Sequence, residues 1–158
     1  MSRAKSSSHG SSPVVGERFY DSDLVFLRRF TGPVMLVARI MLAYIFIVSG
    51  ATYIGQYADV AEYMQANGVD PRLLPLVIAT ELGGGLLVLV GVKTRWAALA
   101  LFGFCLLTAL FFHLGVDQTI DFRKNLAMAG GFLTLAILGP GLWSLDGWRG
   151  RAGWRVLR

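Results

Sequence analysis

The chain has 158 residues, of which 54% are hydrophobic and 16% are charged, and its formal net charge is +5. Its mean hydropathy of +0.56 is high for a soluble domain, which needs a large polar surface that this composition does not supply. The composition therefore favours a single integral membrane domain. The positive charge does not indicate a nucleic-acid-binding protein, because no basic patch is interleaved with a soluble fold.

The first 32 residues are mostly polar and are predicted to form a cytoplasmic tail. The stretch Ser2–Ser12 is rich in serine and low in complexity, so we expect it to be disordered. Residues 19–30 could form a helix in the membrane interface, or they could be a solvated basic end. Because this long polar segment precedes the first apolar run, that run does not resemble a cleavable signal peptide.

Four apolar runs follow, at 33–54, 73–92, 96–115 and 126–143. Twenty helical residues span about 30 Å, which is the thickness of the hydrocarbon core of a bilayer. The runs lack the polar stripe that the helices of a soluble bundle show. We therefore predict an all-α, four-helix membrane bundle, up-down-up-down, in a domain over 33–143. A basic cytoplasmic tail over 144–158 follows it.

The basic residues indicate how this bundle is oriented. Eleven Lys and Arg residues lie before the first run, between the second and third, and after the fourth, whereas three lie in the other two loops. Cytoplasmic loops of membrane proteins carry an excess of Lys and Arg. The sequence therefore predicts that both termini are cytoplasmic.

Few residues could carry out chemistry. Cys105 is the only cysteine, so the chain cannot exchange a disulfide by itself. The only histidines are His9 and His113, and no cluster has the spacing of metal ligands. No phosphate-binding glycine loop follows a strand. We therefore expect no metal and no intrinsic cofactor, and the sequence does not predict a stand-alone enzyme.

Two ionisable residues lie inside apolar runs. Arg39 is about two turns from the cytoplasmic end of the first run, and Glu81 is near the middle of the second. Such residues usually face the bundle interior and mark function. The two side chains could pair, directly or through water. Alternatively, Arg39 could reach the inner headgroups while Glu81 stays protonated.

The residues around this pair suggest close packing of the first two helices. Gly83, Gly84 and Gly85 come shortly after Glu81, and we interpret them as a place where helices approach closely. On the first run, six residues recur at spacings of three and four and so share one helix face. They are Arg39, Ala43, Phe46, Gly50, Tyr53 and Tyr57.

A second polar group gathers at the predicted outer side. It comprises Tyr53, Gln56, His113, Asp117, Asp121, Lys124 and Asn125. Hydroxyl, imidazole and amide groups of this kind could bind a quinone headgroup. They could equally cap the ends of the helices and the loops between them.

At these residues the chain resembles the DoxX family of small four-helix bacterial membrane proteins. The resemblance covers residues 37–146. Its motifs are RIMLAYIFIVSG from Arg39, ELGGGLLVLVGVKTRWAA from Glu81, His113, KNLAM from Lys124 and GPGLWSLD from Gly139. The chain departs from the pattern in one place, because Tyr53 and Gln56 stand where the family often has a lysine.

The resemblance implies a multi-pass protein of the bacterial inner membrane. Some family members are named as subunits of a terminal quinol oxidase, and others are placed in membrane oxidoreductase assemblies linked to thiol and superoxide defence. It therefore implies an accessory or subunit of a quinone-linked system, with a bound quinone and with a redox partner protein or a second copy of the chain. In that role Glu81 would relay a proton or bind the headgroup, His113 would assist, and Arg39 would balance charge. The alternative is a non-enzymatic scaffold or small-molecule carrier.

Overall fold

The computed structural model describes the backbone of residues 15–112 and 118–156, and the side chains of residues 30–112 and 118–150. These parts of the chain are helical and contain no strand, as predicted. The helices are α1 (Val15–Gly55), α2 (Tyr57–Ala66), α3 (Leu74–Ile78), α4 (Gly84–Val90), α5 (Thr94–Phe112), α6 (Thr119–Leu138) and α7 (Leu145–Val156). A 3₁₀ turn, η1 (Pro71–Leu73), precedes α3, and a π-helical turn, η2 (Ala79–Gly83), joins α3 to α4.

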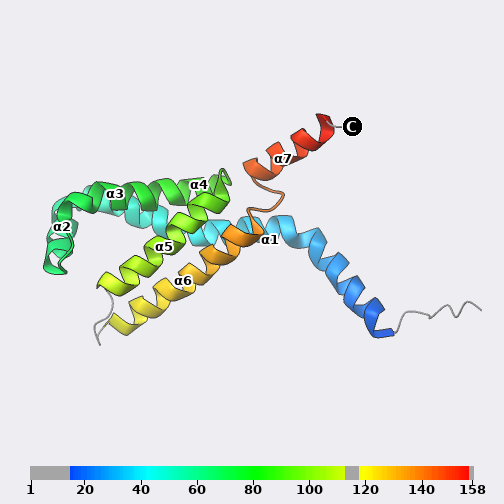
Figure 1. The fold of residues 1–158 in the computed structure, drawn as a ribbon, viewed down its shortest axis with the longest axis horizontal. Coiled ribbons are helices and arrows are strands. Elements are labelled where there is room, and N and C mark those ends of the chain that lie inside the picture. The colour runs from blue at the N-terminus through cyan, green and yellow to red at the C-terminus, as the bar shows by residue number, and fades with distance from the viewer. Residues whose placement is uncertain (1–14, 113–117, 157–158) are drawn as a thin grey trace, which may run out of the picture.

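Four rods pack together: α1, the continuous α3–η2–α4 segment, α5 and α6 (Figure 1). The chain reverses direction from each rod to the next. We call one end of this bundle the α2 end, where α1 and α5 finish and α3 begins. The other is the α7 end, where α4 and α6 finish and α5 begins.

The first helix is longer than the sequence predicts. Instead of a separate helix over 19–30 and a spanning helix over 33–54, α1 is continuous from Val15 to Gly55. Pro33 lies inside it. A proline removes one backbone hydrogen bond and bends a helix without necessarily ending it. Accordingly, the N-terminal part of α1 turns away from the bundle (Figure 1).

The fourth predicted segment, 126–143, is misplaced at both ends. The helix there, α6, begins at Thr119 and ends at Leu138. It stops because Gly139 and Gly141 have left-handed φ angles of 83° and 77° on either side of Pro140, which cannot continue a helix. The second and third segments shift by only a few residues. Helix α2 lies between the first two predicted segments and was not expected.

The core lies between α1, α4, α5 and α6. The face of α1 that the sequence predicts is buried from Arg39 to Gly50, and Tyr53 at its end is half-buried. Tyr57 was expected on the same face, but it begins α2 and is exposed. The ring of Phe46 packs edge-on against Phe132 of α6, with centroids 5.2 Å apart. Much of the remaining core is small, which lets the helices come close. Its other members include Val88, Ala97, Ala98, Leu101, Cys105, Ala129 and Leu135.

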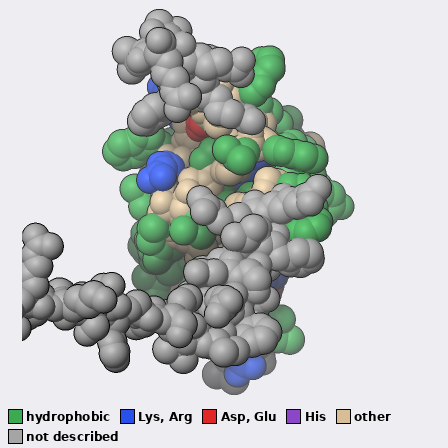
Figure 2. All heavy atoms as spheres, turned by 90° about the vertical axis from the view of Figure 1, so that its right-hand side faces the viewer, with side chains coloured by type: hydrophobic (Ala, Val, Ile, Leu, Met, Phe, Trp, Pro, Cys, Tyr) green, Lys and Arg blue, Asp and Glu red, His purple; other side chains and the backbone are tan. Residues whose placement is uncertain are grey.

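The outside of the bundle is apolar. Large hydrophobic side chains are exposed on every rod, among them Met41, Leu76, Phe111 and Ile137. Figure 2 shows hydrophobic side chains around the bundle in end view, with few charged ones among them. Three stretches of the described residues are long and apolar enough to cross a membrane: Phe30–Gly55, Pro71–Val90 and Thr94–Phe112. A fourth crossing by α6 and the cytoplasmic location of both termini stay predictions.

Candidate functional site

Arg39 is buried at the α7 end of the bundle, with 1% of its surface exposed. Its guanidinium donates hydrogen bonds to three backbone carbonyl oxygens: Nη1 to Pro140 at 3.0 Å, and Nη2 to Trp143 at 2.9 Å and to Leu89 at 3.3 Å. Carbonyls at the end of a helix have no partner within that helix. Arg39 therefore joins α1 to the end of α4 and to the loop after α6.

A second set of contacts surrounds Arg39. A carboxylate oxygen of Asp146 accepts hydrogen bonds from the backbone N–H of Thr94 at 3.0 Å and from its hydroxyl at 3.2 Å. The backbone N–H of Asp146 donates to the carbonyl of Gly91 at 2.9 Å. Gly91 has φ +79°, and a Cβ there would lie 2.6 Å from Arg39 Nη1. The three motifs that contain these residues thus meet at the α7 end.

The hydrogen bonds around Asp146 also set its ionisation. Partial burial alone would raise the pKa of this carboxyl, but the N–H groups of Thr94 and Lys93, the Thr94 hydroxyl and the nearby Arg149 outweigh it. The pKa of Asp146 is therefore held below its ordinary value. The carboxylate lies at the N-terminus of α5, where the helix dipole favours a negative charge.

Among the residues that the structure describes, Glu81 is the second buried charged residue, and it has no such partners. It lies on η2 and is 5% exposed. Its Oε2 is buried without a hydrogen-bond partner, and no ion pair joins it to Arg39 among the residues that the structure describes. Arg39 thus forms no direct ion pair with Glu81 and does not reach outward, because its guanidinium binds the three backbone carbonyls. A π-helical turn around an unpaired buried carboxyl is a feature found often at functional sites.

The glycines beside Glu81 differ in their surroundings. A Cβ on Gly85 would lie 2.9 Å from Ile47 Cγ1 of α1, and one on Gly84 would lie 3.0 Å from Leu101 Cγ of α5. Gly84 and Gly85 therefore lie where helices approach closely. Gly83 does not, because a Cβ there would meet nothing within 4 Å.

A cavity of about 810 Å³ extends from Glu81 toward the α2 end. Its walls come from α1, α2, α3, α5 and α6. They are mostly apolar and aromatic, and the aromatic lining includes Phe46, Phe104, Phe111 and Phe112. Polar side chains besides Glu81 also line this space: Ser49, Tyr53, Tyr63, Asp70, Thr80, Thr108, Lys124 and Asn125. A concave, mostly apolar space with a few convergent polar groups is typical of a small-molecule site.

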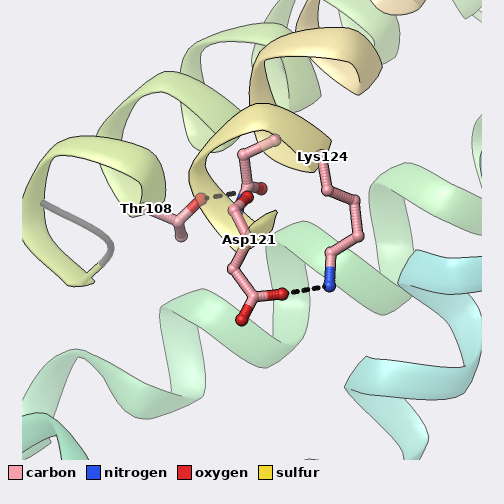
Figure 3. Close-up of polar contacts among 4 residues, drawn as sticks. Thr108, Asp121 and Lys124 are labelled. Carbon is pink, nitrogen blue, oxygen red and sulfur yellow. Dashed lines mark hydrogen bonds and ion pairs between the residues drawn. The ribbon is translucent and has the colours of Figure 1, made fainter. Parts of the chain in front are cut away.

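Part of the predicted outer group therefore lines the same cavity as Glu81. Part of it makes polar contacts in the first turns of α6 (Figure 3). The Asn125 amide donates to the carbonyl of Asp121 at 3.1 Å, and its oxygen lies 3.3 Å from the Thr108 hydroxyl. Lys124 pairs with the Asp121 carboxylate at 2.6 Å. Gln56 is exposed at the start of α2. His113 and Asp117 lie outside the described residues.

Two polar residues of this structure were not singled out from the sequence. Thr108 lies inside the apolar run on α5, and its hydroxyl donates to the backbone carbonyl of Phe104. A threonine inside a transmembrane helix commonly bonds to its own backbone, which hides its role. Asp146 was quoted only as part of a motif. Its spacing of 52 residues from Thr94 gives no local signal of the contact.

Among the described residues, no group of His, Cys, Asp or Glu could hold a metal ion.

Comparison with known proteins agrees with the motifs. A family model described as DoxX matches residues 34–114, about half of the chain. Inner membrane protein YqjF of Escherichia coli (strain K12) is 49% identical over 115 residues, covering 71% of this chain and 88% of the relative. Inner membrane protein YphA of the same organism is 35% identical over 122 residues, covering 71% and 87%. No solved structure matches.

Proposed function

Because this chain belongs to the DoxX family and is a multi-pass inner-membrane protein, we propose that it is an accessory subunit of a quinone-linked membrane oxidoreductase system. In this proposal the cavity beside Glu81 binds the quinone headgroup. A redox partner protein, or a second copy of the chain, completes the system. The fourth crossing is α6, and both termini are cytoplasmic, as the distribution of Lys and Arg favours.

The observation that carries the proposal is the unpartnered carboxyl of Glu81 at the wall of the cavity. Leaving a buried polar atom without a hydrogen bond costs about 1–3 kcal/mol. A ligand that hydrogen-bonds this carboxyl would offset that cost. Since burying an isolated carboxylate is costlier still, Glu81 carries a proton in the proposed resting state and donates it in a hydrogen bond.

The rest of the lining fits a quinone in its chemistry. A quinone headgroup is a flat ring with two carbonyl oxygens that accept hydrogen bonds. Phe46 and Phe104 offer apolar ring surfaces, and Tyr53 and Lys124 offer donors toward the α2 end. When bound, the quinone supplies the capacity to accept or release electrons and protons. Glu81 binds the headgroup and can hold or release a proton at its carboxyl oxygen.

The chain cannot supply the electrons alone. Its only cysteine, Cys105, is buried in the core, so no dithiol is available. This supports an accessory role, in which the partner carries the redox centre. A scaffold or small-molecule carrier would have no need for quinone turnover.

Quinone binding to the purified protein in lipid nanodiscs tests the proposal. The probe is a short-chain benzoquinone, and the variants are Glu81→Met, Glu81→Gln and the matched control Glu62→Met on α2. Glu62 is exposed and does not line the cavity. We expect Glu81→Met to weaken binding about tenfold, the loss of one good hydrogen bond, while Glu81→Gln and Glu62→Met bind nearly as tightly as the native protein.

Two results would contradict the proposal. If the native protein takes up no more quinone than empty nanodiscs do, the cavity is not a quinone site and the scaffold or carrier alternative gains. If quinone binds but quinol oxidation in membranes is the same with native protein, with Glu81→Met and without the protein, the oxidoreductase role is lost while the binding site stands.

A further inference from the structure

Helix α2 closes the cavity at the α2 end. Met64 on its inner side is buried, and Tyr63 stacks on Phe112 at the end of α5, with ring centroids 5.6 Å apart and planes 16° from parallel. Both Tyr63 and Met64 line the cavity. The described residues therefore place a helix across the end from which a polar solute would arrive.

The α7 end is closed by tight packing of α4 against α5. Gly84 lies directly against Leu101, and Val88 and Ala97 are buried there as well. Glu81 lies next to this closed end, on the turn before α4. The described side chains of α4 and α5 therefore pack closely on this side of the carboxyl.

The side of the bundle between α3 and α5 is different. From the point where α4 and α5 pack, α3 and α5 diverge toward the α2 end (Figure 1). The side chains that line the cavity along this gap are apolar and are also exposed on the outside. They are Leu73 and Leu76 on one side, and Leu99, Leu107 and Phe111 on the other.

We infer that the cavity opens sideways to the bilayer between α3 and α5, and that the hydrocarbon chain of a lipophilic ligand lies in this opening with its polar head at Glu81. This rests on the proposed function in one respect, since it requires that the cavity take a ligand. The inference adds the class of ligand, which is an amphiphile with a long hydrocarbon chain. It also adds the route by which the ligand enters, which is from the lipid phase.

The physical reason is the match between the opening and its surroundings. The exposed leucines on both sides of the opening face hydrocarbon in a membrane. A hydrocarbon chain that passes between them therefore exchanges one apolar environment for another. A polar solute on this route would first have to leave water, which costs several kcal/mol for each unpaired polar group. The head of the amphiphile regains hydrogen bonds only when it reaches the polar side chains inside.

Photocrosslinking tests the inference with a matched pair of positions on α5. Leu107 and Leu110 are both 55% exposed, but only Leu107 lines the cavity. The variants Leu107→benzoylphenylalanine and Leu110→benzoylphenylalanine are irradiated in nanodiscs that contain phospholipid and a small fraction of long-chain quinone. We expect the quinone chain to be enriched several-fold over its bulk fraction at position 107 and not at position 110. Excess short-chain benzoquinone should remove the enrichment.

The outcomes separate this inference from the proposed function. Equal crosslinking at both positions, with short-chain benzoquinone still bound in a Glu81-dependent way, would overturn the sideways opening and leave the headgroup site intact. Enrichment of a phospholipid chain at 107 in place of quinone would support the opening and overturn the quinone assignment. Crosslinking at neither position above bulk, with no quinone bound, would overturn both.

Discussion

The guanidinium of Arg39 on α1 donates a hydrogen bond at 2.9 Å to the backbone carbonyl of Trp143, which lies 104 positions later in the chain. With its bonds to Leu89 and Pro140, this contact fixes α1 relative to the end of α4 and to the loop after α6. Arg39 is thus a structural residue, held by carbonyl dipoles in place of a carboxylate. The planar fork of arginine suits several acceptors at once, which a lysine ammonium on a flexible stem does not.

We therefore expect Arg39→Met to destabilise the protein by about 3–5 kcal/mol, because it removes three charge-assisted bonds and leaves buried carbonyls unpaired. Arg39→Lys should lose less stability than Arg39→Met. Thermal unfolding of the detergent-purified protein measures the change. Arg123→Met, at an exposed position on α6, is the control and should stay within about 0.5 kcal/mol of the native protein. An equally stable Arg39→Met would show that water or lipid replaces the three bonds.

Asp146 predicts a pH dependence at the same end. Its folded-state pKa lies below the unfolded value of about 4, so its contribution to stability is complete above about pH 4 and is lost as the pH falls through the folded-state pKa. We expect Asp146→Asn to lower stability by about 0.5–1 kcal/mol at neutral pH, and this difference to shrink in acid. Thermal unfolding at a series of pH values measures it. The control Asp59→Asn changes an exposed carboxyl on α2, and a difference that grows in acid would contradict the capping role.

The sequence predicted the features that depend on local pattern. Apolar length predicted four spans, and three stretches of the described residues are long and apolar enough to cross a membrane. The spacing of three and four predicted the buried face that runs from Arg39 to Gly50. It could not predict the partners of Arg39, because they are backbone carbonyls in segments 50 to 104 residues away. Their positions depend on left-handed φ angles at Gly91, Gly139 and Gly141, which the residue type permits but does not dictate.

For Glu81, too, the sequence predicted what depends on local pattern but not what depends on the tertiary structure. The sequence identified it as an inward-facing carboxyl, but whether it pairs with Arg39 depends on depth along two helices. The π-helical turn η2 inserts one extra residue into a turn and rotates the positions after it, and no composition rule predicts where such a turn forms. Likewise, an interior cavity arises from the angle between α3 and α5, which is set by packing at the distant α7 end.

The two neighbouring glycines offer a test of the helix contact. Gly85→Ala brings a methyl group within 2.9 Å of Ile47 Cγ1 and 3.3 Å of the Ile47 backbone nitrogen, so α1 and α4 must separate. We expect a loss of about 1–3 kcal/mol in thermal unfolding. Gly83→Ala, two positions away, meets nothing and should be neutral or stabilising by up to about 1 kcal/mol, because alanine restricts the unfolded chain. The same loss at both positions would point to the π-helical turn and away from the helix contact.

Glu81 should behave in the opposite way to Arg39 when it is replaced. Glu81→Met removes a buried oxygen without a partner and keeps a side chain of similar length, so we expect the ligand-free protein to gain about 1–3 kcal/mol of stability. The gain should come with the weaker quinone binding described above, as is common where a site is kept at the expense of stability. Thermal unfolding in quinone-free detergent measures it, with Glu62→Met as the control. A loss of stability would mean that the carboxyl has a structural role.

If the cavity opens between α3 and α5, a large side chain on its wall should affect quinone binding, whereas the same side chain outside the cavity should not. Gly103 on α5 and Gly130 on α6 both have room, because a Cβ at either would meet nothing within 4 Å, but only Gly103 lines the cavity. A leucine at Gly103 would occupy the space proposed for the ligand chain, whereas one at Gly130, which is exposed, would lie outside the cavity.

We therefore expect Gly103→Leu to weaken or slow the binding of a long-chain quinone several-fold and to affect a short-chain benzoquinone much less. Gly130→Leu should alter neither, and both variants should unfold at temperatures close to that of the native protein, since a Cβ at either position meets nothing within 4 Å. Equilibrium binding and stopped-flow association in nanodiscs measure the two effects. If Gly103→Leu weakens the binding of both quinones equally, the leucine blocks the headgroup site itself. The chain of the ligand then does not lie along this wall of α5.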